Sequence, residues 1–78
     1  MPSENDRIVG RVLREVRERI GIRQADLAGR LGLPQSYISK VETGARALKL
    51  SEVFGYAAAL GIDVHILLAE VAAAVTAD

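Results

Sequence analysis

The sequence predicts an all-α fold of five helices, and three observations lead to that class. Apolar residues recur every three or four positions in successive stretches, and glycines separate most of these stretches. No segment alternates apolar and polar residues as a half-buried strand does, and no stretch repeats another. A chain of 78 residues buries only about 60% of its unfolded surface, so its core must be efficient or shared. We expect one domain over residues 1–78, with residues 1–5 as a flexible start.

The first predicted helix runs from about Asn5 to Ile20. Ser3 followed three residues later by Asp6 resembles a capping box, and Gly21 ends the helix. Arg17 lies at the border between the apolar stripe and the solvent. The stripe consists of five residues at helical spacing: Val9, Val12, Leu13, Val16 and Ile20.

Two short helices follow, joined by a tight turn. The first runs from about residue 24 to residue 31 and ends at Gly32, which adopts a left-handed backbone conformation without steric cost. Pro34 supplies a φ suited to a helix start, and the next helix runs to about residue 43. Ile38 and Val41 of this helix face inward, and Tyr37 lies between its two faces. Polar residues occupy the outward face: Gln35, Ser36, Ser39 and Lys40.

The fourth and fifth predicted helices are more apolar. The fourth ends at Gly61, and five of its residues are expected to be buried: Leu50, Val53, Phe54, Ala57 and Leu60. The fifth, over 63–77, is capped by Asp63, and only His65 and Glu70 interrupt its apolar residues between 64 and 75. So small a domain cannot cover a helix that is apolar nearly all round. We expect a dimer interface rather than a core helix alone, formed by Leu67, Leu68, Val71 and Val75.

The charges divide the chain into two halves of opposite sign, although the formal net charge is zero. Residues 1–49 contain all ten Lys and Arg residues and six of the ten acids, which gives this half a charge of +4. Residues 50–78 contain the other four acids, which gives −4. The first half therefore suits a polyanion such as nucleic acid.

From about residue 8 to residue 68 the chain resembles the Cro and lambda-repressor-like (Xre) helix-turn-helix family. The matching pattern comprises the turn glycine, the inward residues on either side of it and the exit from the second motif helix: Gln24, Leu27, Ala28, Gly32, Ile38, Val41 and the Glu42-Thr43-Gly44 sequence. The resemblance implies a five-helix lambda-repressor-like DNA-binding domain. Its helix-turn-helix lies at about 24–43, and an extended apolar helix follows at 63–77.

The resemblance also implies roles for individual residues. A B-DNA major groove accepts one α-helix, and its base edges offer hydrogen bonds to Gln, Ser and Lys side chains. The resemblance makes the four outward polar residues the base readers: Gln35, Ser36, Ser39 and Lys40. By the same resemblance Gln24 contacts a phosphate and braces the reading helix, while Arg17 and Glu42 form a structural ion pair. The alternative is that these four polar residues form an ordinary solvent-exposed helix face without a binding partner.

Position and charge indicate further phosphate contacts. Tyr37 either contacts a phosphate through its hydroxyl or simply packs, and both alternatives remain open. The further candidates lie on the first three helices and in the exit loop: Arg14, Arg23, Tyr37, Thr43, Arg46 and Lys49.

Several function classes lack the residues they need. The chain has no Cys and a single His, which disfavours a metal site, and it has no Gly-rich phosphate loop or Ser-His-Asp arrangement. We therefore expect no enzyme activity, no cofactor and no metal. The polar start of the chain lacks the apolar core of a signal peptide, and the apolar stretch at 64–75 is too short for a membrane span. A cytoplasmic protein without membrane contact is expected.

These observations predict a homodimeric regulator that binds double-stranded DNA. Two reading helices would enter successive major grooves of a pseudo-palindromic operator, most simply as a repressor of the protein's own gene. Because we expect no sensing domain, the protein's concentration would control occupancy. The alternative is an antitoxin-like interaction module, whose C-terminal helix binds a partner protein such as a toxin and for which DNA binding is secondary.

Overall fold

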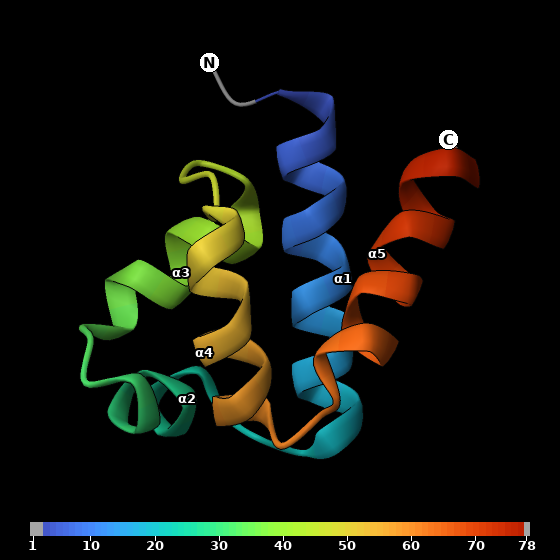
Figure 1. Cartoon of the computed structure of the whole chain (residues 1–78). Coiled ribbons are helices and arrows are strands. Elements are labelled where there is room, and N and C mark those ends of the chain that lie inside the picture. Colours follow the sequence, from blue (N-terminus) through green and yellow to red (C-terminus); the bar gives the residue numbers. More distant parts are fainter. Residues whose placement is uncertain (1–2, 78) are drawn as a thin grey trace.

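The computed structural model describes residues 3–77, and within that range it contains five α-helices and no strand. The helices are α1 (Glu4–Ile20), α2 (Gln24–Leu31), α3 (Gln35–Thr43), α4 (Leu50–Leu60) and α5 (Val64–Ala77). The long α1 packs against α3 on one side and α5 on the other, and α2 packs against both α3 and α4 (Figure 1). The all-α class is confirmed. The molecule measures 31 × 28 × 22 Å.

The first helix begins earlier than the sequence predicted. Ser3 Oγ accepts a hydrogen bond from the backbone N–H of Asp6 at 3.1 Å, so Ser3 is the N-cap and Glu4 and Asn5 are helical. The expected flexible start over residues 1–5 is therefore wrong for residues 4 and 5. Residues 1 and 2 of that expected segment lie outside the described residues.

A close approach between α1 and α3 sets the position of α3. The residue of α1 at the crossing is Gly10, and a Cβ there would lie 2.3 Å from the backbone oxygen of Val41. Any side chain at this position would therefore push the two backbones apart. Ile38 and Val41 are 0% and 1% exposed and fix the inner face of α3 in the core, as predicted.

The buried face of α4 differs from the predicted one. Leu50 and Phe54 are 68% and 56% exposed, whereas Tyr56, which was not expected in the core, is 1% exposed. Ala57 and Leu60 are buried as predicted. Because α4 has apolar residues on nearly every side, its spacing could not decide which face turns inward. The bulk of the Tyr56 ring fills the core, and the Phe54 ring remains at the surface.

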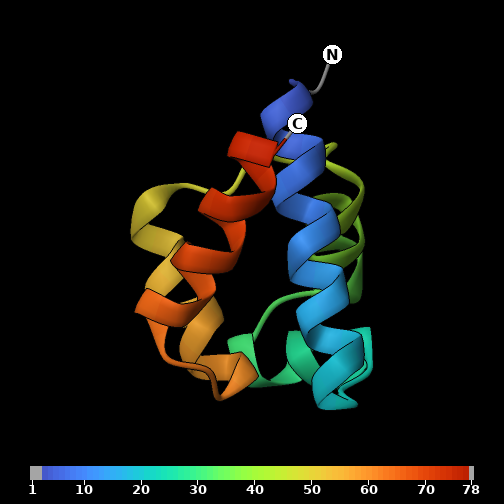
Figure 2. The same cartoon turned by 90° about the vertical axis from the view of Figure 1, so that its right-hand side faces the viewer.

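The last helix runs beside α1, and the start of α1 and the end of α5 lie at the same end of the molecule (Figure 2). Asp63 Oδ1 accepts hydrogen bonds from the backbone N–H groups of His65 and Ile66 at 2.8 and 3.4 Å, so Asp63 caps α5 as predicted. Among residues 3–77 no single helix is long and apolar enough to cross a membrane; α4 and α5 reach that length and composition only as a pair bent by 115°.

Candidate nucleic-acid interface

The turn between α2 and α3 holds the two helices at a fixed angle. Gly32 has a φ of +67°, which side chains rarely adopt, and it ends α2. The backbone N–H of Leu33 then donates to the carbonyl oxygen of Ala28 at 3.0 Å. Ala28 itself is buried, and its small side chain permits close packing of α2 on α3. The turn therefore presents α3 as a projecting helix (Figure 1).

The predicted base readers all lie on the outer side of α3. Gln35, Ser36 and Lys40 are exposed and Ser39 is half-buried. Their helix remains in place because its inner face is apolar and buried, so the polar side chains are free to meet a partner from outside. An arrangement of donors and acceptors on a projecting helix is what base edges in a major groove require.

A hydrogen-bond chain links the outer face of α3 to the protein core. Gln24 at the start of α2 donates from Nε2 to Glu42 Oε1 at 2.9 Å, and its Oε1 accepts from Gln35 Nε2 at 3.3 Å. An ionised carboxylate accepts hydrogen bonds and donates none. The Gln24 amide therefore turns its N–H group to Glu42 and its oxygen outward. Gln24 therefore braces Gln35 in this structure.

Glu42 is in turn held by Arg17 of α1. Arg17 Nε and Nη2 donate to the two carboxylate oxygens at 2.6 and 3.0 Å, and Nη1 donates to the carbonyl oxygen of Ile22 at 2.8 Å. The two side chains are 10% and 2% exposed. The Glu42 carboxylate raises the pKa of Arg17 above its usual value. The expected pair is thus a two-pronged buried bridge from α1 to α3.

The exit loop places Arg46 against α3. The guanidinium carbon of Arg46 lies 4.5 Å from the centre of the Tyr37 ring, and Nη1 and Nη2 donate to the Glu52 carboxylate, each at 3.2 Å. The Tyr37 hydroxyl also donates to Glu52, at 3.2 Å. Tyr37 therefore packs and hydrogen-bonds within the protein, while Arg46 remains partly exposed.

The sequence did not single out Glu52. Its carboxylate accepts from Arg46, from the Tyr37 hydroxyl and from the backbone N–H of Lys49, and these hydrogen bonds lower its pKa to about 2. The signal in the sequence was an acid three residues into a helix start, which is typical of a cap. Its contacts with the loop and α3 depend on the fold.

The other phosphate candidates are spread over the same half of the molecule. Arg14 pairs with Glu18 at 3.5 Å and Arg23 with Asp26 at 3.2 Å. Thr43 Oγ1 donates to the carbonyl oxygen of Lys40 at 3.1 Å. Lys49 is exposed at the start of α4. The candidates all lie within residues 1–49, but Arg14 and Arg23 form local ion pairs of their own and do not join the cluster around Arg46.

The helix starts add two anion-attracting positions. The N-cap residues of α2 and α3, Arg23 and Pro34, make no side-chain cap hydrogen bond, unlike Ser3 and Asp63 at the starts of α1 and α5. The first backbone N–H groups of a helix carry partial positive charge and attract phosphates when no cap occupies them. The hydrogen bond between Gln35 and Gln24 connects the two helix starts.

The predicted dimer residues divide into two groups. Leu67 is 1% exposed and lies in the core of its own protomer, so its assignment to the interface is wrong. Leu68 is 36% exposed, and Val71 and Val75 are half-buried. The reason is that Leu67 faces α1, which the nearly uniform apolar sequence of α5 did not reveal.

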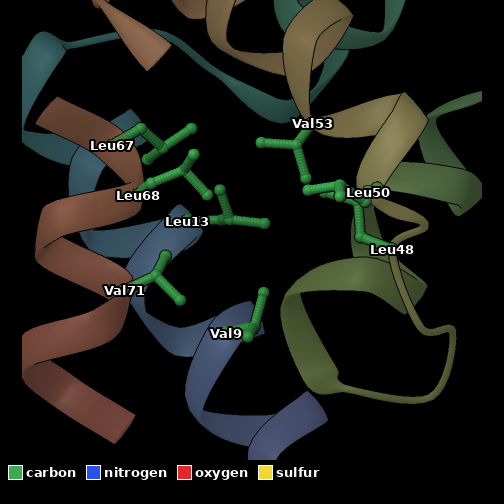
Figure 3. Close-up of a pocket in the computed structure, with 8 residues that line it drawn as sticks. All are labelled: Val9, Leu13, Leu48, Leu50, Val53, Leu67, Leu68 and Val71. Atoms are coloured by element: carbon green, nitrogen blue, oxygen red, sulfur yellow. The ribbon is translucent and has the colours of Figure 1, made fainter. Parts of the chain in front are cut away.

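An apolar pocket of about 220 Å³ opens between α1, α4 and α5. Figure 3 shows its lining side chains converging from the three helices and from the loop before α4. They are Val9, Leu13, Leu48, Leu50, Val53, Leu67, Leu68 and Val71. Between residues 3 and 77 no group of three His, Asp or Glu side chains could hold a metal ion.

Comparison with known proteins shows the same arrangement elsewhere. The family model described as helix-turn-helix matches residues 13–67. A predicted HTH-type transcriptional regulatory protein of Methanoculleus marisnigri is 47% identical over 53 residues, which are 62% of this chain and 17% of that protein. The chain thus spans about a sixth of the length of this curated relative.

Solved structures resemble almost the whole chain. The restriction-modification controller protein C.AhdI from Aeromonas hydrophila is 35% identical, with a TM-score of 0.76 over 83% of this chain and 98% of that one. C.Esp1396I bound to a 25 base pair operator site is 23% identical, with a TM-score of 0.85 over 95% and 97% of the two chains. The second likeness shows a shared fold.

Proposed function

The chain belongs to the helix-turn-helix family of DNA-binding transcriptional regulators, and from that premise we propose that it is a homodimeric repressor. In this proposal α3 of each protomer enters the major groove of a pseudo-palindromic operator, with half-sites about one helical turn apart. The genes that it would repress are restriction-modification genes, which the 35% identity to the controller protein C.AhdI supports, and its own gene.

The observation that carries the proposal is the chain from Arg17 through Glu42 and Gln24 to Gln35. It ends in a side chain at the start of a projecting helix, where an operator's base edges would lie. Because Gln24 Oε1 accepts from Gln35 Nε2, the remaining N–H and the Oε1 of Gln35 are left for a base. A glutamine held in this way loses little freedom on binding, which favours specific recognition.

The proposed base readers are the four outer residues of α3. A glutamine side chain matches the donor and acceptor pair of adenine, and a lysine matches the acceptors of guanine. A serine hydroxyl can donate or accept a hydrogen bond and can therefore contact either base. We assign these roles to Gln35, Ser36, Ser39 and Lys40.

The proposed phosphate contacts surround that face. The half of the chain that contains them has a charge of +4, so it is attracted to DNA of any sequence. Uncapped helix starts at Arg23 and Pro34 add to this attraction. We assign phosphate contacts to Gln24, Arg23, Arg14, Thr43, Arg46 and Lys49. Tyr37, the seventh candidate, would reach a phosphate only by giving up the hydrogen bond that its hydroxyl donates to Glu52.

Self-association would use the exposed apolar side chains of α4 and α5. Of the six large exposed apolar residues in the described chain, four lie on α4 and α5: Leu50, Phe54, Ile66 and Leu68. A surface of this kind is costly in water and is typical of an interface. The pocket beside Leu50 and Leu68 gives it a concave part. Val71 and Val75 extend the proposed interface, and Leu67 supports it from within the core.

The rival interaction module receives no support from the relatives named above. Their descriptions concern transcriptional regulation, restriction-modification control and operator binding, and none mentions a toxin. The single-domain organisation over residues 1–78 and the cytoplasmic location remain predictions that accompany the regulator.

Selection of bound sequences from random duplexes tests the proposed function. The wild-type chain should enrich a pseudo-palindrome. Gln35→Ala should cost about 1 to 3 kcal/mol on that duplex and relax the preference at one base pair of each half-site. Arg46→Ala should weaken all duplexes similarly and reduce the salt dependence by about one unit of slope. Uniform weakening by both variants would contradict the division into base and phosphate contacts.

A further inference from the structure

Glu52 connects three separate elements of the proposed DNA-binding half. Its Oε1 accepts from Arg46 Nη1 at 3.2 Å and from the backbone N–H of Lys49 at 2.8 Å. Its Oε2 accepts from Arg46 Nη2 and from the Tyr37 hydroxyl, both at 3.2 Å. One carboxylate from α4 therefore holds the exit loop and the middle of the proposed reading helix together.

The loop arginine is restrained from several sides. Its guanidinium stacks over the Tyr37 ring, and Nη1 also donates to the carbonyl oxygen of Ala47 at 3.1 Å. Its backbone N–H donates to the carbonyl oxygen of Lys40 at 3.1 Å. No hydrogen bond within residues 3–77 uses Nε of Arg46. The Nε edge is therefore the part of the guanidinium available to a phosphate.

Restraint changes what an arginine does on DNA. A free arginine reaches phosphates in many registers, because its side chain has many rotamers, and it adds to binding at any sequence. A restrained arginine meets a phosphate only where the backbone passes its open edge, and it loses less freedom there. The adjacent carboxylate also opposes attraction to phosphates elsewhere, since it offsets the arginine charge.

We propose that Glu52 is a positioning residue that aims Arg46 and thereby increases the ratio of operator binding to non-specific DNA binding. This inference rests on the proposed function, because it requires that α3 and the exit loop meet DNA. The carboxylate acts through Arg46 and Tyr37 and touches no DNA itself.

Glu52→Gln is the direct test, with Glu70→Gln as the matched control. Both variants remove one negative charge from a carboxylate paired with an arginine, but Glu70 pairs with Arg19 across α1 and α5, at 2.7 Å. Glutamine at position 52 retains an oxygen that can accept from the Lys49 backbone, so the start of α4 is preserved. Thermal denaturation of each variant checks that the fold is intact.

The measured quantity is the ratio of dissociation constants for non-specific and operator duplexes, obtained by fluorescence anisotropy at matched salt. Glu52→Gln should tighten non-specific binding by about threefold to tenfold, leave operator binding unchanged and so lower the ratio by the same factor. Glu70→Gln should leave the ratio within about twofold of wild type. In an Arg46→Gln background, the effect of Glu52→Gln on the ratio should vanish.

Two results would overturn the inference alone. One is a ratio in Glu52→Gln that equals the ratio in Glu70→Gln, in a wild-type chain that does prefer its operator. The other is an effect of Glu52→Gln that persists without Arg46, which would assign it to net charge or general structure. A wild-type chain without any sequence preference would instead refute the proposed function, and the inference with it.

Discussion

The outer faces of α3 and α5 differ in chemistry although both helices pack against α1. The exposed side of α3 is polar, and a hydrogen-bond chain that ends at the buried Arg17 fixes part of it. The exposed side of α5 includes Ile66 and Leu68, which are 55% and 36% exposed. A polar, braced face suits a hydrogen-bonding partner such as DNA, whereas an apolar face suits a second protein surface.

The same division appears in the buried polar groups. On the α3 side the Arg17 guanidinium and the Glu42 carboxylate satisfy each other inside the core. On the α4 side the buried hydroxyl of Tyr56 has no hydrogen-bond partner in the described residues. A buried ion pair fixes how its two helices are oriented, because each charged partner needs the other. A hydroxyl without a hydrogen-bond partner fixes no orientation. We infer that a buried ion pair positions α3 on α1, whereas the ion pairs of α4 and α5, Glu52 with Arg46 and Glu70 with Arg19, are partly exposed.

Glu42→Ala should have the largest effect of any single change on this comparison. It leaves the Arg17 guanidinium buried without its partner and releases Gln24. The free energy of unfolding, measured by urea denaturation, should fall by about 3 kcal/mol. The control is Glu70→Ala, which removes the half-buried partner of the exposed Arg19 and should change stability little. Equal losses of stability in the two variants would show that the buried ion pair does not hold α3 in place.

Gly10→Ala comes next and tests the close approach of α1 to α3. The new Cβ would meet the backbone oxygens of Val41 and Glu42 at 2.3 and 2.7 Å, and a backbone cannot move aside as a side chain can. We expect a loss of about 2 to 3 kcal/mol in thermal denaturation. Gly29→Ala in α2 meets nothing within 4 Å and should gain about 0.5 to 1 kcal/mol instead. A stable Gly10→Ala protein would mean that the two helices separate easily.

Phe54→Ala tests the apolar side. If the exposed ring is buried between two copies, its loss should weaken self-association at least about tenfold, or about 1.4 kcal/mol, in sedimentation equilibrium. Leu33→Ala removes another exposed apolar side chain, in the turn before α3, and should leave self-association unchanged. If Leu33→Ala weakened the dimer and Phe54→Ala did not, the interface would lie near the start of α3 and not on α4 and α5.

Tyr56→Phe should have the smallest effect. The change removes a buried hydroxyl that has no hydrogen-bond partner and keeps the ring in the core. Stability should stay within about 1 kcal/mol of wild type or rise slightly, as measured by chemical denaturation. A loss above about 2 kcal/mol would reveal a hydrogen bond to this hydroxyl and would remove the contrast with the α3 side.

The sequence predicted the parts of this molecule that local rules decide. Glycines 21, 32, 44 and 61 end the first four helices with positive φ, as their positions indicated. The inward residues of α3 followed from spacing, because its polar and apolar residues lie on opposite sides.

Other features depend on how the helices meet. Phe54 and Tyr56 are both apolar enough for a core, so only packing decides that Tyr56 is buried. Gly10 has no local role in α1, and its function depends on the α3 backbone beside it. Glu52 was not singled out by the sequence, because the fold alone brings Arg46 and Tyr37 to it.

We propose that the outer face of α3 meets DNA while the apolar face of α4 and α5 does not. The most direct measurement is an NMR titration of the isotope-labelled protein with the selected duplex, followed by backbone amide shifts. The largest shifts should occur at residues 35–40 and 43–46 and at the start of α2, with little change along α5. Large shifts along α5 together with unmoved signals from residues 35–40 would contradict it.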